Sequence, residues 1–248
     1  MYRLVVSLNK PLIVKYIDLI KETQGFKKSS LLNGAREIIK SKTKLDDQLL
    51  DSLVKIIIEG IKDKERLIKE HSMEALDSLQ YNYQNKLLQL YLEDNIRKII
   101  HESCKTDNTY MKVADFGGGN KIVEDKGVGI RRAALDIETF MINSFNHKII
   151  YAEIIPLLID CLLDIDDNLQ SIVYSDITKL AKLNSMAFLP FGGQFIDILF
   201  KVWDTLKIEE SKRNFSINVK NIFEALKDVE SVTGNPRYNL VVIEINKH

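Results

Sequence analysis

Apolar residues recur along this chain at the three- and four-residue spacing of amphipathic helices. In the stretch from about Leu45 to Ile61, for example, Leu49, Leu53 and Ile57 fall on one helical face. Taken along the whole chain, the pattern predicts about ten helices of roughly 13 to 20 residues. Their approximate ranges are 11–24, 29–39, 45–61, 67–79, 87–100, 130–145, 149–163, 167–183, 194–206 and 211–229.

Helices of similar length joined by short turns form pairs, which repeat about every 40 to 50 residues. A single pair leaves an apolar face exposed, and stacking on the next pair buries it. We therefore expect an all-α protein, an α-α superhelix of the HEAT type with about five helix pairs. An irregular helical bundle would produce the same periodicity and remains the alternative.

One interruption of the helical pattern, at about residues 104–128, predicts an inserted β-hairpin. Two strand-like runs, Tyr110–Phe116 and Lys121–Asp125, flank Gly117–Asn120, where glycines supply the positive φ angles of a tight reversal. An isolated hairpin is marginal in water, so this one must rest on a helix, be mobile or be completed by a partner. The expected organisation is thus HEAT-type repeats over 1–103, the hairpin insertion over 104–128, and C-terminal HEAT-type repeats over 129–248.

Two local features stay open at this level. Pro156 lies inside the apolar segment 149–163 and is expected to kink that helix or to mark a late start. Asn239–Ile245 has the composition of a strand, yet Asn235-Pro236 could open a short helix before it.

Composition narrows the class of protein. Of the 248 residues, 45% are hydrophobic and 28% charged, which excludes general disorder. Lys plus Arg and Asp plus Glu number 35 each, so the formal net charge is zero. This balance argues against a strongly basic nucleic-acid binder and leaves room only for a local basic patch. The uncharged run Leu183–Ile196 is too short for a membrane span, and the N-terminus lacks a signal-peptide pattern. We expect a soluble intracellular protein whose two cysteines are free thiols.

The residue types that carry chemistry form no recognisable active site. Asp115-Phe116-Gly117 is like the magnesium-binding triplet of kinases, but the catalytic and glycine-rich loops of a kinase are absent, and turn geometry explains the glycines better. His101 and Cys104 are three residues apart, and two ligands do not make a zinc site. The acidic pairs Asp46-Asp47 and Asp166-Asp167 stand at expected helix starts, where capping is their favoured role. We expect no enzyme activity, cofactor or metal.

A resemblance to a known family lies just after the hairpin. Residues 123–134 read V-E-D-K-G-V-G-I-R-R-A-A. This segment resembles V-D-D-G-L-D-I-R-K-A-A, which follows a β-hairpin near the C-terminus of the cullin-associated and neddylation-dissociated proteins. Further similarities run in the same order, at Ser29–Leu32, at Ile68-Lys69 and over 154–183. The resemblance covers roughly residues 8–230 with gaps.

Departures from the family pattern concern the hairpin and the helix after it. This chain has one extra residue, Lys126 or a neighbour, before Gly127. Gly129 replaces an aspartate that, in HEAT repeats, helps to tie adjacent repeats together with the following arginine. The tip G-G-G-N differs from the family's G-P-F-K. Family members are longer solenoids, so this chain would match their C-terminal portion, as a fragment or a truncated gene product.

The resemblance implies a non-enzymatic regulator of cullin-based ubiquitin ligases in the cytoplasm and nucleus. Such a scaffold binds an unmodified cullin, and through it the RING subunit, and competes with substrate-adaptor modules. Nucleic acid and membrane are not expected partners. The residues it points to for partner binding lie in the hairpin: Lys112, Asp115, Phe116, Gly117, Gly118, Gly119, Asn120, Lys121, Glu124 and Asp125.

Two further expectations concern partners. The alternative function is that of another α-solenoid scaffold, of the transport-adaptor or phosphatase-scaffold type, in which the hairpin is only a long loop. The first helix is expected to expose a face for stacking, through which the chain would self-associate. The residues of that face are Leu12, Ile13, Tyr16, Ile17 and Ile20.

Overall fold

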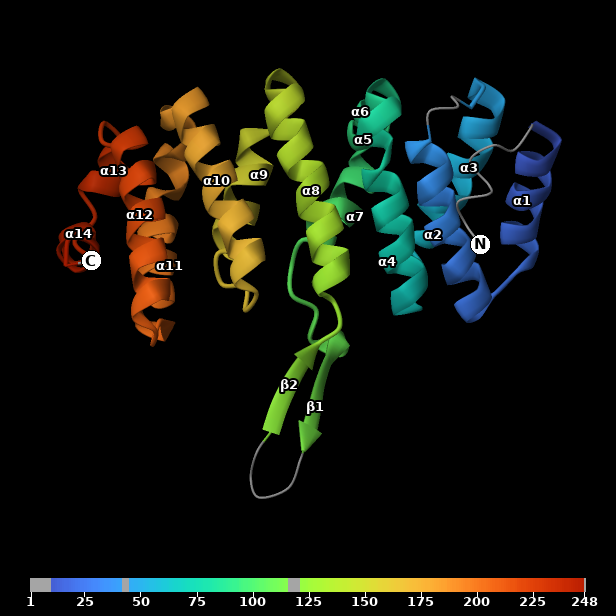
Figure 1. The fold of residues 1–248 in the computed structure, drawn as a ribbon. Coiled ribbons are helices and arrows are strands. Elements are labelled where there is room, and N and C mark those ends of the chain that lie inside the picture. The colour runs from blue at the N-terminus through green and yellow to red at the C-terminus, as the bar shows by residue number, and fades with distance from the viewer. Residues whose placement is uncertain (1–9, 42–44, 116–120, 248) are drawn as a thin grey trace. The chain divides into compact units, whose positions relative to one another are not determined.

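A computed structural model describes residues 10–41, 45–115 and 121–247 of the chain (Figure 1). The chain divides into two compact units, Met1–Ile137 and Glu138–His248, here called the N-terminal and C-terminal units. The boundary lies inside a single helix, α8, and the β-hairpin belongs to the N-terminal unit. The sequence predicted that the second group of helices starts at residue 129, nine residues before the C-terminal unit starts at Glu138.

Alternate helices pack on one another in the N-terminal unit. Helix α1 contacts α3, and α2 lies along α4, so that two layers of helices share an apolar core. The elements are α1 (Lys10–Glu22), α2 (Gly25–Lys40), α3 (Asp47–Gly60), α4 (Arg66–Asp77), α5 (Leu79–Asn82), α6 (Gln84–Tyr91), α7 (Asp94–Ser103), β1 (Met111–Asp115), β2 (Lys121–Asp125) and α8 (Val128–Ser144), which continues into the next unit.

The C-terminal unit repeats this arrangement. Helix α10 packs along α12 and α9 contacts α11, while the short helices α13 and α14 rest on α11 and α12. The helices are α9 (Tyr151–Cys161), α10 (Asp167–Leu183), α11 (Gly192–Thr205), α12 (Glu209–Ala225), α13 (Glu230–Thr233) and α14 (Tyr238–Ile245). The prediction of an all-α class with one inserted hairpin is confirmed in the described part of the chain.

Two helix starts show why the sequence folds locally as it does. Asp46 accepts a hydrogen bond from the backbone N–H of Leu49 at 2.9 Å, and Asp166 accepts from those of Asn168 and Leu169 at 3.0 Å. These carboxylates satisfy donors that have no partner within their helices. The capping role predicted for both acidic pairs is therefore confirmed at their first members.

The structure shows that Pro156 does not mark the start of its helix and that residues 238–245 are helical. Helix α9 runs through Pro156, having started five positions earlier at Tyr151. Residues 238–245 form helix α14 rather than a strand, because Val241 and Ile245, four positions apart, are both buried and α14 packs against α11 and α12. Composition favoured a strand here, and tertiary packing overrode that preference.

One described helical stretch, Ser185–Thr205, is long and apolar enough to cross a membrane by length and composition, with a mean hydropathy of 1.2. The sequence-based expectation rested only on the uncharged run Leu183–Ile196, which is too short for a membrane span. The helical stretch is longer because it continues through α11. Its large side chains, including Phe188, Phe195 and Leu199, are buried in the C-terminal unit. Over its most apolar window 39% of the stretch is buried, and Met186 and Leu189 are exposed.

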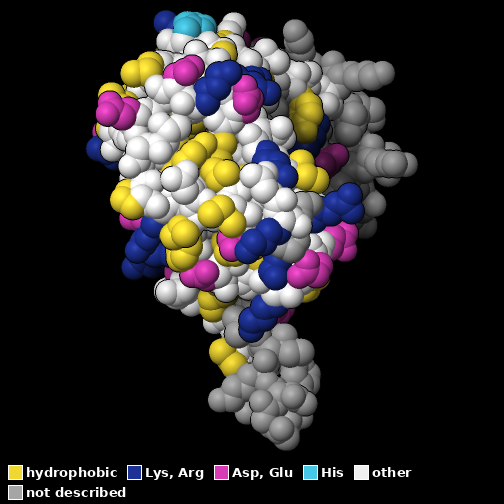
Figure 2. Space-filling model, turned by 90° about the vertical axis from the view of Figure 1, so that its left-hand side faces the viewer, with side chains coloured by type: hydrophobic (Ala, Val, Ile, Leu, Met, Phe, Trp, Pro, Cys, Tyr) yellow, Lys and Arg dark blue, Asp and Glu magenta, His cyan; other side chains and the backbone are white. Residues whose placement is uncertain are grey.

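Hydrophobic side chains also reach the surface at the end of the C-terminal unit that carries α14. Figure 2 views this side and shows several of them gathered among lysines, arginines and acidic residues. Leu240 and Ile243 of α14 and Ile217 of α12 are exposed. Single exposed apolar residues are normal on folded proteins, so only a group of them calls for an explanation.

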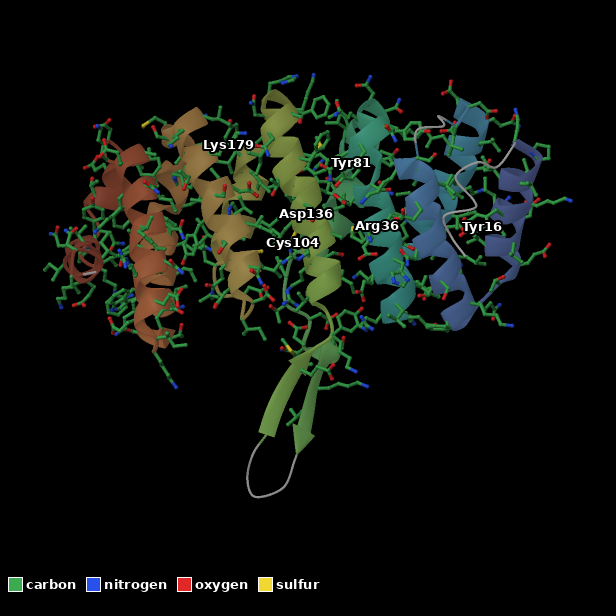
Figure 3. All side chains as sticks on the ribbon, viewed as in Figure 1. Tyr16, Arg36, Tyr81, Cys104, Asp136 and Lys179 are labelled. Carbon is green, nitrogen blue, oxygen red and sulfur yellow. The ribbon has the colours of Figure 1, made fainter. Side chains whose placement is uncertain are left out.

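The first helix differs from expectation because its apolar face is used inside its own unit. Its buried residues are Ile13, Ile17 and Ile20. Tyr16 (Figure 3) donates a hydrogen bond from its hydroxyl to the backbone carbonyl of Leu31 in α2. Helical spacing identifies an apolar face but not the neighbour that covers it, so the predicted stacking face was wrong for these residues. The exposed apolar residues of α1 are Leu12, Val14 and Leu19.

Candidate interaction site

The β-hairpin projects away from the helices of the N-terminal unit (Figure 1). Its strands β1 and β2 are antiparallel, with Met111 opposite Asp125, Val113 opposite Val123 and Asp115 opposite Lys121. In the described part of the chain this sheet has two strands, so no third strand covers either edge. Open strand edges can pair with an added strand from a partner.

The structure places the predicted partner-binding residues in three groups. The tip residues Phe116, Gly117, Gly118, Gly119 and Asn120 lie outside the described residues. Asp115 and Lys121 are the last and first residues of their strands and oppose each other in the register. Lys112 and Glu124 also oppose each other, and both are exposed. Val113, which the sequence reasoning did not select, exposes 62% of its surface.

Asp125 is the exception among these residues, because it belongs to the fold. Its carboxylate accepts a hydrogen bond from the Arg131 guanidinium at 2.6 Å, and the two side chains are only 6% and 2% exposed. It also accepts from the backbone N–H of Gly127 at 2.7 Å. The ion pair gives Asp125 a role in the fold, while its predicted partner-binding role stays a prediction. Sequence spacing cannot reveal that the end of a strand is buried.

A second arginine holds the chain where the hairpin ends. The Arg66 guanidinium of α4 donates to the backbone carbonyl of Lys126 at 2.9 Å and forms an ion pair with Glu70 one turn further along α4. The N–H of Lys126 donates to the carbonyl of Tyr110 at 3.1 Å, which closes the hairpin at its base. We call Arg66, Glu70, Asp125 and Arg131 the hairpin anchor. It ties the C-terminal end of the hairpin to α4 and α8, and the N-terminal end is joined to it through the hydrogen bond from Lys126 to Tyr110.

Burial and charge act in opposite directions within the hairpin anchor. Burial taken alone would raise the pKa of Asp125, but hydrogen bonds from Arg131 and Gly127, with the Arg131 charge, hold that pKa below its usual value. Burial raises the pKa of Glu70, and the nearby Arg66 charge offsets this only in part. The anchor therefore contains one firmly ionised carboxylate, Asp125, and one that holds its proton more readily, Glu70.

The anchor also explains the glycine that departs from the family pattern. A Cβ placed on Gly129 would come within 2.8 Å of the Glu70 side-chain carboxyl carbon. Any side chain at position 129 must therefore displace Glu70. The family pattern has an aspartate at the position of Gly129. In this chain Asp125, which precedes the turn into α8, forms the ion pair with Arg131.

This close approach predicts an energetic coupling between positions 129 and 70. Gly129→Ala should destabilise the wild-type protein, because Glu70 is pushed away from Arg66. In a Glu70→Ala background the same substitution should be neutral or stabilising by up to about 1 kcal/mol, since alanine favours a helix over glycine. Denaturant unfolding of the four proteins measures this cycle. An equal effect of Gly129→Ala in both backgrounds would show that the contact carries no energy.

Side chains that could ligate a metal ion do not gather here or elsewhere in the described residues. No set of three His, Cys, Asp or Glu side chains is close enough to hold a metal ion. Cys104 is buried, and His101 lies 3.4 Å from the Tyr91 hydroxyl. This region contains an anchored hairpin with open strand edges, the exposed Val113, and Lys112 opposite Glu124 in the register. Open edges of this kind can pair with an added strand.

No protein-family model and no curated protein matches the chain. Several solved structures do, among them three crystal structures of engineered proteins from the Northeast Structural Genomics Consortium. Each is 12% identical to this chain with a TM-score of 0.55. The matches cover 97%, 94% and 97% of this chain and 95%, 56% and 100% of those structures. At this level of identity the similarity concerns the fold alone, and the fold is all-α.

Proposed function

We propose that this chain is a protein-interaction scaffold of the α-solenoid type that binds an unmodified cullin, with the hairpin competing against substrate adaptors. The observation that carries the proposal is a hairpin held rigidly at its base while its strands stay uncovered by the described part of the chain. A buried ion pair that serves only to shape an unused loop would be costly to retain.

The alternation of packed helices supports the solenoid part of the proposal. In both units the first and third helices of a set contact each other, as do the second and fourth. Repeated units that bury their apolar faces only on their neighbours give this pattern. A globular bundle would instead gather its helices around one shared centre.

The resemblance of residues 123–134 to the cullin-associated and neddylation-dissociated proteins supports the cullin part. That segment now has a structural place, because it runs from β2 through the hairpin anchor into the first turns of α8. The order of hairpin, turn and helix is the order that the resemblance implies. The family's cullin scaffolds use this region against adaptor modules, and we propose the same role here.

The test measures cullin binding and adaptor displacement separately. In the hairpin variant, residues 112–124 are replaced by a short Gly-Ser linker, which leaves Asp125, Lys126 and their partners in place. We expect this variant to displace adaptor from an unmodified cullin–RING complex at least about tenfold more slowly, a difference of about 1.4 kcal/mol. Its affinity for the adaptor-free cullin should fall by less, because the helices supply most of the contact area.

A matched pair of point variants serves as the control. Val113→Ser alters the hairpin, and Ile165→Ser alters a residue of the same 62% exposure in the C-terminal unit. Only Val113→Ser should slow displacement. If the wild-type chain does not bind any cullin, the cullin proposal fails and the other α-solenoid scaffolds become the better explanation. If it binds but the linker variant displaces adaptor normally, the hairpin assignment alone is wrong.

A further inference from the structure

A small polar cavity lies between α10 and α12 in the C-terminal unit. Its volume is about 60 Å³. Its polar lining comprises Asp167, Gln170, Ser171 and Tyr174 from α10 and Ser211, Asn214 and Asn218 from α12. One water molecule needs roughly 10–15 Å³ of such space, so the cavity can take several waters or the head group of one long side chain.

Tyr174 is the buried polar side chain of this lining. It is 4% exposed, and its ring packs edge-on against Phe215 with 6.1 Å between centroids. Its hydroxyl has no hydrogen-bond partner among the described protein atoms. Burial raises the pKa of Tyr174, so the group stays a neutral hydroxyl that can both donate and accept. Buried hydroxyls normally have a partner, and this one borders a space that could admit it.

The charges around the cavity favour a cation. Asp167 is the one ionisable carboxylate among the lining residues, and no lysine or arginine lines the cavity. An adjoining hollow shares Asn214 and adds Glu209 and Glu210, with Arg213 as its single cation. Lys212 is already held, because its ammonium lies 3.2 Å from the Glu209 carboxylate and over the Trp203 ring.

We propose that this cavity binds the guanidinium group of an arginine from a protein partner. The Tyr174 hydroxyl and the Asn218 amide oxygen would accept hydrogen bonds from its planar set of donors, and Asp167 would supply the opposite charge. The adjoining hollow is also lined by Ile217, which is 53% exposed. Ile217 would contact an apolar residue next to the arginine of the partner. This site is remote in sequence from the hairpin and independent of whether the partner is a cullin.

The test uses the dipeptide acetyl-Arg-Leu-amide, titrated into the full chain and followed by two-dimensional NMR. We expect saturable shifts confined to residues near 167–174 and 211–218. The neutral isostere acetyl-citrulline-Leu-amide should bind at least about tenfold more weakly, because it lacks the charge that Asp167 recognises. Equal binding of the two peptides, or no saturable shift with the arginine peptide, would overturn the proposal and leave the cavity to water.

Tyr174→Phe separates a binding role from a structural one. Removing a buried hydroxyl without a partner should raise or preserve the melting temperature, whereas binding of the arginine peptide should weaken about fivefold or more. Asp167→Asn should reduce the preference for arginine over citrulline, and Asp228→Asn, on an exposed site of the same unit, should not. If Tyr174→Phe binds the peptide as well as the wild type, the assignment is wrong. Asn218→Ala gives a second test should Tyr174→Phe fold poorly.

Discussion

Replacing Arg131 by methionine is expected to lower the free energy of unfolding by about 3–5 kcal/mol, the usual cost of removing one partner from a buried ion pair. In the wild type the Asp125 side chain is 6% exposed, and without Arg131 its charge keeps only the hydrogen bond from the Gly127 N–H among the contacts described above. Because Asp125 closes the hairpin onto α8, the loss should also loosen the hairpin. Urea unfolding measures the first effect, and amide hydrogen exchange of β1 and β2 measures the second.

A second arginine–aspartate pair provides the matched control. Arg237 and Asp197 lie 2.7 Å apart, close to the 2.6 Å of the buried pair, but their side chains are about half exposed. Arg237→Met should therefore cost less than about 1 kcal/mol. Equal losses in the two variants would show that burial does not govern the strength of the Asp125–Arg131 pair.

The same pair predicts a pH dependence. The pKa of Asp125 in the folded protein lies below its usual value of 3.8, so the unfolded state binds the proton more readily. The stability that the pair contributes is thus complete above about pH 5 and is lost as the pH falls through the folded-state pKa. The difference in stability between the wild type and Arg131→Met should shrink at low pH.

Asp77 is expected to make the protein less stable as the pH rises from 5 to 8, by roughly 2–3 kcal/mol. Burial, together with the Asp136 charge, raises its pKa from 3.8 to about 7, against the weaker opposing effects of Lys40, Gln80 and Arg36. The folded state therefore keeps a proton that the unfolded state has already lost, and stability falls until Asp77 ionises in the fold. Figure 3 marks Arg36 on α2 and Asp136 on α8.

Asp77→Asn should remove most of this slope, since an amide cannot ionise and can still accept the 2.5 Å hydrogen bond from Gln80. Above pH 7 the variant should be more stable than the wild type. Asp94→Asn, which changes a carboxylate on the surface, should leave the slope in place. Thermal unfolding of the three proteins across this pH range tests the assignment. If the loss of stability with rising pH persists in Asp77→Asn, its source is instead Asp136 or Glu70, because burial also raises the pKa values of these two carboxyls.

The hairpin divides into a part that sequence could predict and a part that it could not. Two strand-like runs around a glycine-rich tip are local signals, and the structure forms β1 and β2 at those positions. The partner of Asp125 is not local information. Its selection as a binding residue followed from its place in a hairpin, whereas its burial follows from the approach of α8.

Local patterns along the chain are enough to predict the helical class, the place of the insertion and the capped helix starts at Asp46 and Asp166. These depend on neighbours within a few positions, where spacing and chemistry are visible in the chain. Long-range packing is needed to explain four other features: the helical state of 238–245, the inward face of α1, the hairpin anchor and the buried hydroxyl of Tyr174. In each case the deciding contact comes from another element, because a side chain is covered or paired only when packing brings that element to it.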